Sequence, residues 1–157
     1  MMNRRNAAIA GGVIAGIVTT AAMWAGRRSG VLGKTLDRDA VDWIDRTTGA
    51  RAVVGDAGTS SIEFVNHLGA SAAFGGLYEQ VRRWGPNVPP AALGVAFGTA
   101  LYAVNIAGIA PLLGITEGEV EAGARKASER WALHVLQSVV TAVVADYLTT
   151  DEDEATA

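Results

Sequence analysis

The stretch from Trp84 to Thr116 constrains the fold more than any other part of the chain. Its 33 residues include no Asp, Glu, Lys or Arg. The central part, residues 90–113, would form a helix about 36 Å long at about 1.5 Å per residue. This length spans a hydrocarbon core of about 30 Å with some tilt. We therefore expect a transmembrane helix here, and we interpret the other segments around it.

The composition of the whole chain agrees with a membrane protein. Of the 157 residues, 18% are charged and 19 are Gly, whereas about 25% are charged in an average soluble domain. Gly is common in membrane helices because small residues allow the backbones to approach closely. The net charge of −3 and the lack of a basic stripe do not favour a nucleic-acid partner. There is no Cys, which rules out disulfides and Cys nucleophiles.

Three further apolar segments predict helices near residues 7–25, 61–81 and 129–148. The first has charged residues on both sides and a poor cleavage site, so we favour a retained membrane helix over a signal peptide. Ser60 and Glu63 have the spacing of a capping box for the second helix, and Ser128 is the expected N-cap of the last one.

The expected fold class is therefore all-α, as an integral membrane bundle of four transmembrane helices. It forms a single domain over residues 1–148, and residues 149–157 form an acidic disordered tail. Residues 36–46 have the periodicity of a short amphipathic helix in the first link. This helix either lies along the membrane interface or covers the ends of the bundle. A soluble, tightly packed helical bundle is the alternative architecture.

Small residues four positions apart are the expected helix-packing sites, because this spacing gives an apolar helix a flat face. The pairs are Gly12 and Gly16, Gly69 and Ala73, and Gly94 and Gly98.

The second half of the chain combines several short features in one order. These are His67, Phe74 and Tyr78, then Pro89-Pro90, Gly94 and Gly98, the run Pro-Leu-Leu-Gly-Ile-Thr at 111–116, and Ser128-Glu129 followed by His134. This order resembles the YagU-like family of small bacterial inner-membrane proteins over residues 64–148. The resemblance implies a four-helix inner-membrane protein and supplies no catalytic residues.

Four crossings would put both termini on one side of the membrane and the first and third links on the other. Nine Lys and Arg residues lie on the link side and four on the termini side. The positive-inside rule therefore places the links in the cytoplasm. Arg4 and Arg5 before the first helix favour the opposite orientation, so both remain open.

Polar residues within the expected membrane helices are the candidate site, because ionisable groups are costly there. The candidate cluster is His67, His134, Glu63, Asn66 and Asn105. The simpler interpretation is that Glu63 caps a helix and the others hydrogen-bond between helices. The functional interpretations are a proton or ion relay, a metal site, or bis-His haem ligation through His67 and His134.

The leading interpretation of function is an inner-membrane protein that aids ion or proton homeostasis or serves as a partner subunit. The alternative is a haem- or metal-binding redox protein that uses His67 and His134. No phosphate loop, nucleophile elbow or zinc motif occurs, so the sequence does not favour an enzyme. The expected partners are the lipid bilayer and either a second copy or another membrane protein, and no cofactor is favoured.

Overall fold

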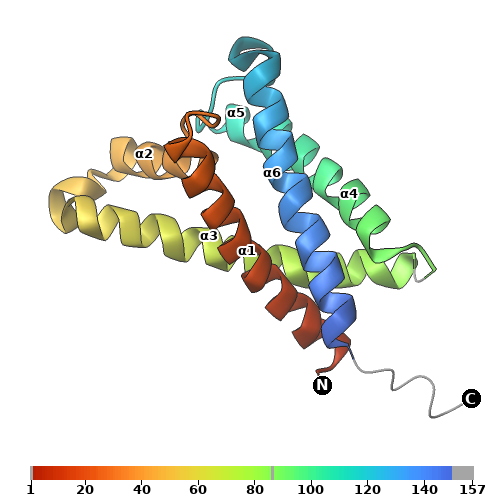
Figure 1. Cartoon of the computed structure of the whole chain (residues 1–157). Helices are drawn as coiled ribbons and strands as arrows, with labels where there is room; N and C mark the ends of the chain where they lie inside the picture. The colour runs from red at the N-terminus through yellow and green to blue at the C-terminus, as the bar shows by residue number, and fades with distance from the viewer. Residues whose placement is uncertain (1, 86, 150–157) are drawn as a thin grey trace, which may run out of the picture.

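The computed structural model describes residues 2–85 and 87–149, and the elements of this part of the chain are all helices (Figure 1). Their bounds are α1 Arg4–Arg28, α2 Leu36–Thr48, α3 Ala50–Trp84, α4 Pro90–Leu101, the π-helix η1 Tyr102–Ile109, α5 Ala110–Leu112 and α6 Glu119–Leu148. The prediction of an all-α fold is confirmed. The acidic tail expected at 149–157 lies, from residue 150 onward, outside the described residues.

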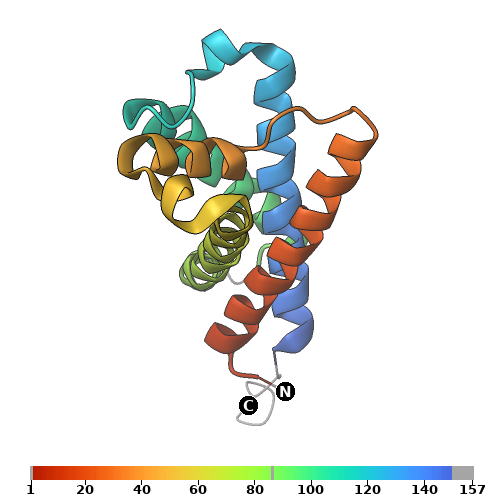
Figure 2. The ribbon, with the colours of Figure 1, turned by 90° about the vertical axis from the view of Figure 1, so that its left-hand side faces the viewer.

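Helix α6 is the central element. It packs against α1 on one side and α4 on the other, and α1 also packs against α3. Figures 1 and 2 show that α1 and α6 run side by side in opposite directions, whereas α3 crosses them at an open angle. The backbone N–H of Met2 donates to the carbonyl of Leu148 at 3.2 Å. We call this end of the molecule the termini end. The opposite end, which contains α2 and the start of α6, is the link end.

Three described helices are long and apolar enough to cross a membrane, by length and composition: Arg4–Arg28, Pro90–Leu112 and Glu119–Leu148. Between 28% and 39% of the most apolar window of each helix is buried inside the structure, so most residues of each window keep some exposed surface. Helix α3 has 35 residues but is not among the three, since polar residues such as Asn66 and His67 lower the hydropathy of its apolar stretch. The structure thus supplies three of the four expected crossings by this criterion.

Glycines bring the backbones of α1 and α3 into direct contact. A Cβ atom added to Gly12 would lie 2.2 Å from the carbonyl oxygen of Ser71, and one added to Gly75 would lie 2.2 Å from the carbonyl oxygen of Ala8. Any larger side chain would push the two helices apart. Gly11 approaches α6 in the same way, with its added Cβ 2.8 Å from the carbonyl oxygen of Thr141.

Gly94 and Gly98 make the equivalent contact between α4 and α6. Their added Cβ atoms would lie 2.8 Å from the Cα of Val139 and 2.7 Å from the carbonyl oxygen of His134. Gly69 and Ala73 are not in a helix contact, because both are exposed and an added Cβ at Gly69 meets open space. The packed face of α3 lies two residues further along, at Ser71 and Gly75.

Two expected helix starts are wrong, because the helical segments begin earlier, just after glycines whose backbone is not helical. Gly55, at φ 68°, kinks α3, and Gly123, at φ 81°, kinks α6. Ser60 is therefore inside α3, and Glu63 pairs with Arg38 of α2 at 3.4 Å instead of capping a helix. Ser128 is inside α6, where its hydroxyl donates to the carbonyl of Arg125.

The apolar stretch around residue 100 forms α4, η1 and α5 in succession. Pro111 has no N–H, and its ring crowds the carbonyl four residues earlier, so the regular α-helical pattern cannot continue there. The preceding turns widen, and Ala110 donates to the carbonyl of Asn105, five residues back. Wide turns of this kind are rare and frequently occur at functional sites.

Candidate functional site

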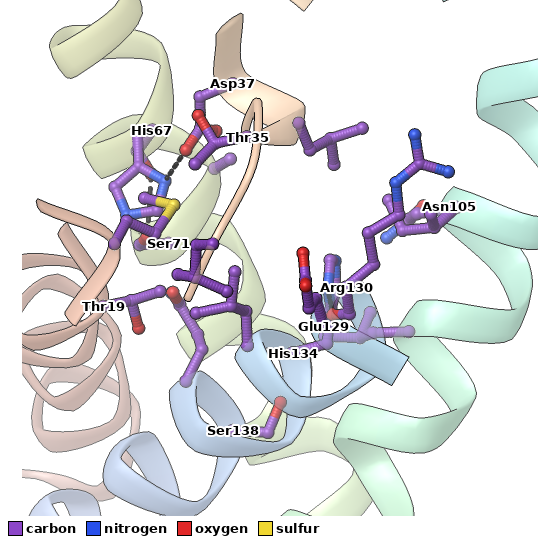
Figure 3. Close-up of a pocket in the computed structure, with 18 of the residues that line it drawn as sticks. Thr19, Thr35, Asp37, His67, Ser71, Asn105, Glu129, Arg130, His134 and Ser138 are labelled. Atoms are coloured by element: carbon purple, nitrogen blue, oxygen red, sulfur yellow. Dashed lines mark hydrogen bonds and ion pairs between the residues drawn. The ribbon is translucent and has the colours of Figure 1, made fainter. Parts of the chain in front are cut away.

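A cavity of about 190 Å³ lies at the link end, enclosed by α1, α3, η1 and α6 and bordered by residues 32–35 and the start of α2 (Figure 3). Its walls are mainly apolar, with contributions from Phe74, Leu101 and Ile106. The polar residues that line it are Thr19, Lys34, Thr35, Asp37, His67, Ser71, Asn105, Lys126, Glu129, Arg130, His134, Gln137 and Ser138. Five separate parts of the chain therefore supply polar groups to one cavity.

His67 joins three helices at the cavity wall. Its Nε2 lies 3.0 Å from the carbonyl oxygen of Gly16 on α1, and its Nδ1 lies 3.2 Å from Oδ2 of Asp37 on α2 (Figure 3). A carbonyl oxygen only accepts hydrogen bonds, so Nε2 carries a proton and donates it to Gly16. A neutral imidazole has only one N–H, so favourable contact at Nδ1 requires a second proton, carried by the ring or by the Asp37 carboxyl.

His134 has a different environment from His67, although it lines the same cavity. Its Nδ1 lies 2.8 Å from the carbonyl oxygen of Arg130, one turn earlier on α6. Nδ1 is therefore the donor, and in the neutral ring Nε2 keeps a lone pair that can accept a proton. The ring packs edge-on against Tyr102 with 6.2 Å between the centroids.

Arg130 ties the start of α6 to η1 and α2. It is 5% exposed, its Nη1 lies 2.6 Å from Oε1 of Glu119, and its Nη2 lies 3.7 Å from Oδ2 of Asp39. The Tyr102 hydroxyl donates to the other Glu119 oxygen at 2.7 Å. A buried guanidinium is tolerated only with such partners, so this network fixes the rim of the cavity.

Lys34 holds the loop before α2 to that helix. Its Nζ lies 2.8 Å from carboxylate oxygens of both Asp39 and Asp42. Hydrogen bonds to Asp39 and Asp42 raise the pKa of Lys34, and the hydrogen bond from Lys34 lowers the pKa of Asp42. These charges hold the segment beside the cavity in place.

Several polar atoms in the cavity wall have no partner within the described part of the chain. They are the hydroxyls of Thr19 and Ser138 and the side-chain nitrogen of Gln137, all in buried residues. Buried polar groups are normally hydrogen-bonded. The cavity is large enough for several water molecules, which would satisfy these groups.

The structure brings together three of the five polar residues predicted from the sequence. His67, His134 and Asn105 line the cavity, whereas Glu63 does not and Asn66 is exposed. Asp37 and Arg130 were not predicted from the sequence, because both stand in charged segments and outside the uncharged parts of the expected membrane helices. Glu119 and Arg130 both belong to α6 in the structure. Gly123 lies between them in the sequence and gave no indication that the two residues would meet.

The residues of the cavity do not fit the haem or metal alternatives. Both nitrogens of His67 already face oxygen atoms, so iron ligation through either would break the contact with Gly16 or Asp37. Within residues 2–85 and 87–149, no group of three His, Asp or Glu side chains is arranged to hold a metal ion. This donor set suits proton binding better than metal ligation.

Comparisons of the chain with protein-family models, with curated proteins and with solved structures find no match.

Proposed function

We propose that this chain is a four-helix protein of the bacterial inner membrane that binds and releases a proton at the Asp37–His67 pair. Through this pair it contributes to proton homeostasis. The three apolar helices support a position in the bilayer, and α3, at 35 residues, is long enough to be the fourth crossing. The resemblance of residues 64–148 to the YagU-like family points in the same direction.

The outward-facing side chains of the apolar helices support this position. Ile17 is 53% exposed and Val104 57% exposed, and both lie in segments that would cross the membrane. Large apolar side chains exposed along several helices favour contact with lipid or with another membrane protein, rather than with water.

The observation that carries the proton-binding proposal is the pair of oxygen acceptors around His67. The Gly16 carbonyl and the Asp37 carboxylate face opposite nitrogens of one ring. An imidazole is the side chain whose charge changes most readily near neutral pH, and an acceptor at each nitrogen favours the doubly protonated ring. The adjoining cavity gives the pair a route to water.

The state of the His67 ring can be measured by ¹⁵N NMR of detergent-solubilised protein labelled at histidine. The chain has two His residues, so His134→Leu leaves a single ring and assigns both. At neutral pH we expect both nitrogens of His67 to give imidazolium-type shifts. In Asp37→Asn the ring should become neutral, because the carboxylate that stabilises its second proton is absent.

The matched control is Asp45→Asn, which removes a carboxylate from the same helix near Arg51 and away from His67. This variant should leave the His67 signals unchanged. A neutral His67 ring in the unmodified protein at pH 7, or a ring that is insensitive to Asp37→Asn, contradicts the proposal.

A further inference from the structure

A second cavity, of about 270 Å³, lies at the termini end of the assembly. It is lined by Arg4 of α1, by Tyr78, Glu79 and two arginines near the end of α3, and by residues at the end of α6. Glu79 is 3% exposed, and its carboxylate lies 2.5 Å from Nε of Arg83. Each end of the assembly therefore has a cavity with a buried titratable group in its wall.

The two cavities approach each other to within one helical turn on two helices. On α3, Phe74 lines the link-end cavity and Tyr78 lines the termini-end cavity. On α6, Ser138 lines the first and Ala142 the second. Four residues of α-helix correspond to about 6 Å along the axis. On both helices, one turn therefore separates the lining of one cavity from the lining of the other.

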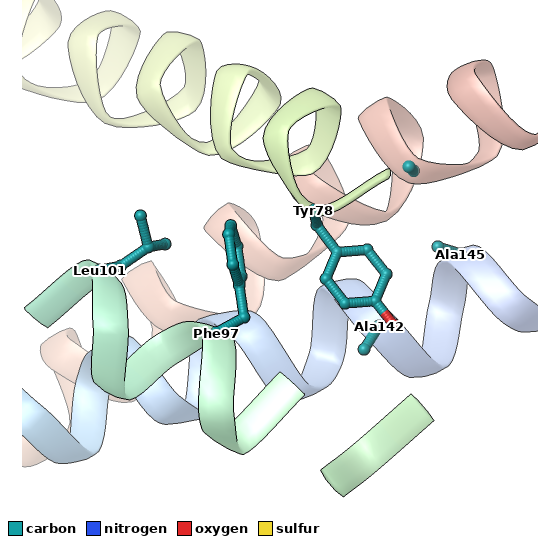
Figure 4. Packing of buried hydrophobic residues seen from close by; sticks show 6 residues of the cluster. Tyr78, Phe97, Leu101, Ala142 and Ala145 are labelled. Atoms are coloured by element: carbon teal, nitrogen blue, oxygen red, sulfur yellow. The ribbon is translucent and has the colours of Figure 1, made fainter. Parts of the chain in front are cut away.

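A layer of core residues packs around Tyr78 (Figure 4). The Tyr78 ring meets Phe97 edge-on with 5.7 Å between the centroids, and Leu101 and Ala142 complete the layer. Tyr78 is 2% exposed and Ser138 1% exposed, and neither hydroxyl has a hydrogen-bond partner among the described residues. Two unsatisfied hydroxyls therefore lie on either side of an otherwise apolar barrier.

We propose that the two cavities are the halves of one proton path across the membrane, interrupted by the Tyr78 layer and bridged by the hydroxyls of Ser138 and Tyr78. This inference rests on the proposed function, because it uses the Asp37–His67 pair as the proton site of the link-end half. A hydroxyl can both accept and donate a proton. The apolar side chains of Phe97 and Leu101 exclude hydrated ions from the same route.

The transfer moves one proton and leaves the protein unchanged. A proton released by the Asp37–His67 pair passes through water in the link-end cavity to the Ser138 and Tyr78 hydroxyls. Each hydroxyl accepts one proton and releases another, and the Glu79 carboxylate accepts the proton on the far side before releasing it to solvent. No other bond forms or breaks, and the proton gradient sets the direction.

Other charged groups lie near the Asp37–His67 pair and near Glu79, and they influence the protonation of both sites. At the link end they are Lys34, Lys126, Glu129 and Arg130 around the cavity and Glu63 on α3, and at the termini end they are Arg4, Arg82, Arg83 and Asp146.

The test is proton flux into liposomes that contain the purified full chain and an entrapped pH-sensitive dye, driven by a potassium diffusion potential. We expect flux above that of empty liposomes and at least a tenfold lower rate in Tyr78→Phe, which keeps the ring and removes the hydroxyl. Tyr147→Phe is the matched control, because Tyr147 is 84% exposed and lines neither cavity. Its flux should equal that of the unmodified protein.

Phe97→Ala tests the barrier independently of the Tyr78 hydroxyl. Removing the ring should let water enter the layer and raise the flux severalfold. Flux equal to that of empty liposomes, or equal rates in Tyr78→Phe and the unmodified protein, overturns the path. If His67 still shows its imidazolium signals in that case, the proton-binding proposal stands and only the transmembrane path is wrong.

Discussion

The region where α1 crosses α3 and the link end are held together by different physical means. At the crossing, Gly12 and Gly75 bring backbone against backbone and leave no space for a side chain. At the link end, Arg130 and the Asp37–His67 pair join helices through long polar side chains, and a cavity of about 190 Å³ lies between them. The comparison indicates that the close crossing fixes the helices, which allows the link end to keep an open polar interior.

The largest expected effect is a substitution at the close crossing. Gly12→Val places atoms where the Ser71 carbonyl oxygen now lies, so α1 and α3 must separate. We expect a loss of about 4–5 kcal/mol of stability, at the upper end for a single substitution because two backbones must separate, measured as a lower thermal midpoint in detergent. Gly69→Val is the control, because Gly69 faces open space. Equal effects of the two substitutions would show that the crossing does not fix the helices.

A loss of similar or slightly smaller size is expected at the link end from Arg130→Met. This change removes the charge and leaves Glu119 and Asp39 without their buried partner. Breaking such a pair costs about 3–5 kcal/mol. Arg125→Met is the control, because the Arg125 side chain is 77% exposed. If both variants melt at the same temperature as the unmodified protein, the rim network does not hold the link end.

The smallest expected effect concerns pH and the attachment of α2. Lys34 lowers the folded-state pKa of Asp42. The contribution of Asp42 to the free energy of unfolding is therefore fully present above its unfolded pKa of about 3.9. The contribution is lost as the pH falls through the lower folded value. We expect less than about 1 kcal/mol from this partly exposed group, seen as lower amide protection factors in α2 at acid pH, after correction for the intrinsic pH dependence of exchange.

Asp42→Asn provides the comparison for this acid effect. The variant should exchange faster than the unmodified protein at neutral pH, and the difference should shrink as the pH falls below the folded pKa of Asp42. A difference that stays constant down to the lowest pH would show that the ion pair does not hold α2.

The sequence predicted the apolar helices better than it predicted where helices begin. Residues 7–25 lie within α1, because an uncharged run of that length has few alternatives. The second and fourth expected helices are parts of longer elements, α3 and α6, each of which is kinked at a glycine with a positive φ and a non-helical backbone. Local capping patterns at Ser60 and Ser128 could not reveal this.

The candidate site was predicted in part for a related reason. His67 and His134 were identified because polar residues stand out in apolar helices. Asp37 and Arg130 lie in charged segments, where sequence patterns indicate solvent exposure. Their burial depends on partners from distant parts of the chain, such as His67 for Asp37, and a single sequence does not show which partners meet.

The proposed function depends most on the position of the apolar helices in a bilayer, and extraction of cell membranes with alkaline carbonate tests this directly. We expect the full chain to remain in the membrane pellet and to enter the supernatant only with detergent. Recovery of the chain in the supernatant after carbonate treatment without detergent would contradict the proposal, because three membrane-spanning helices cannot be released by a change of pH and salt.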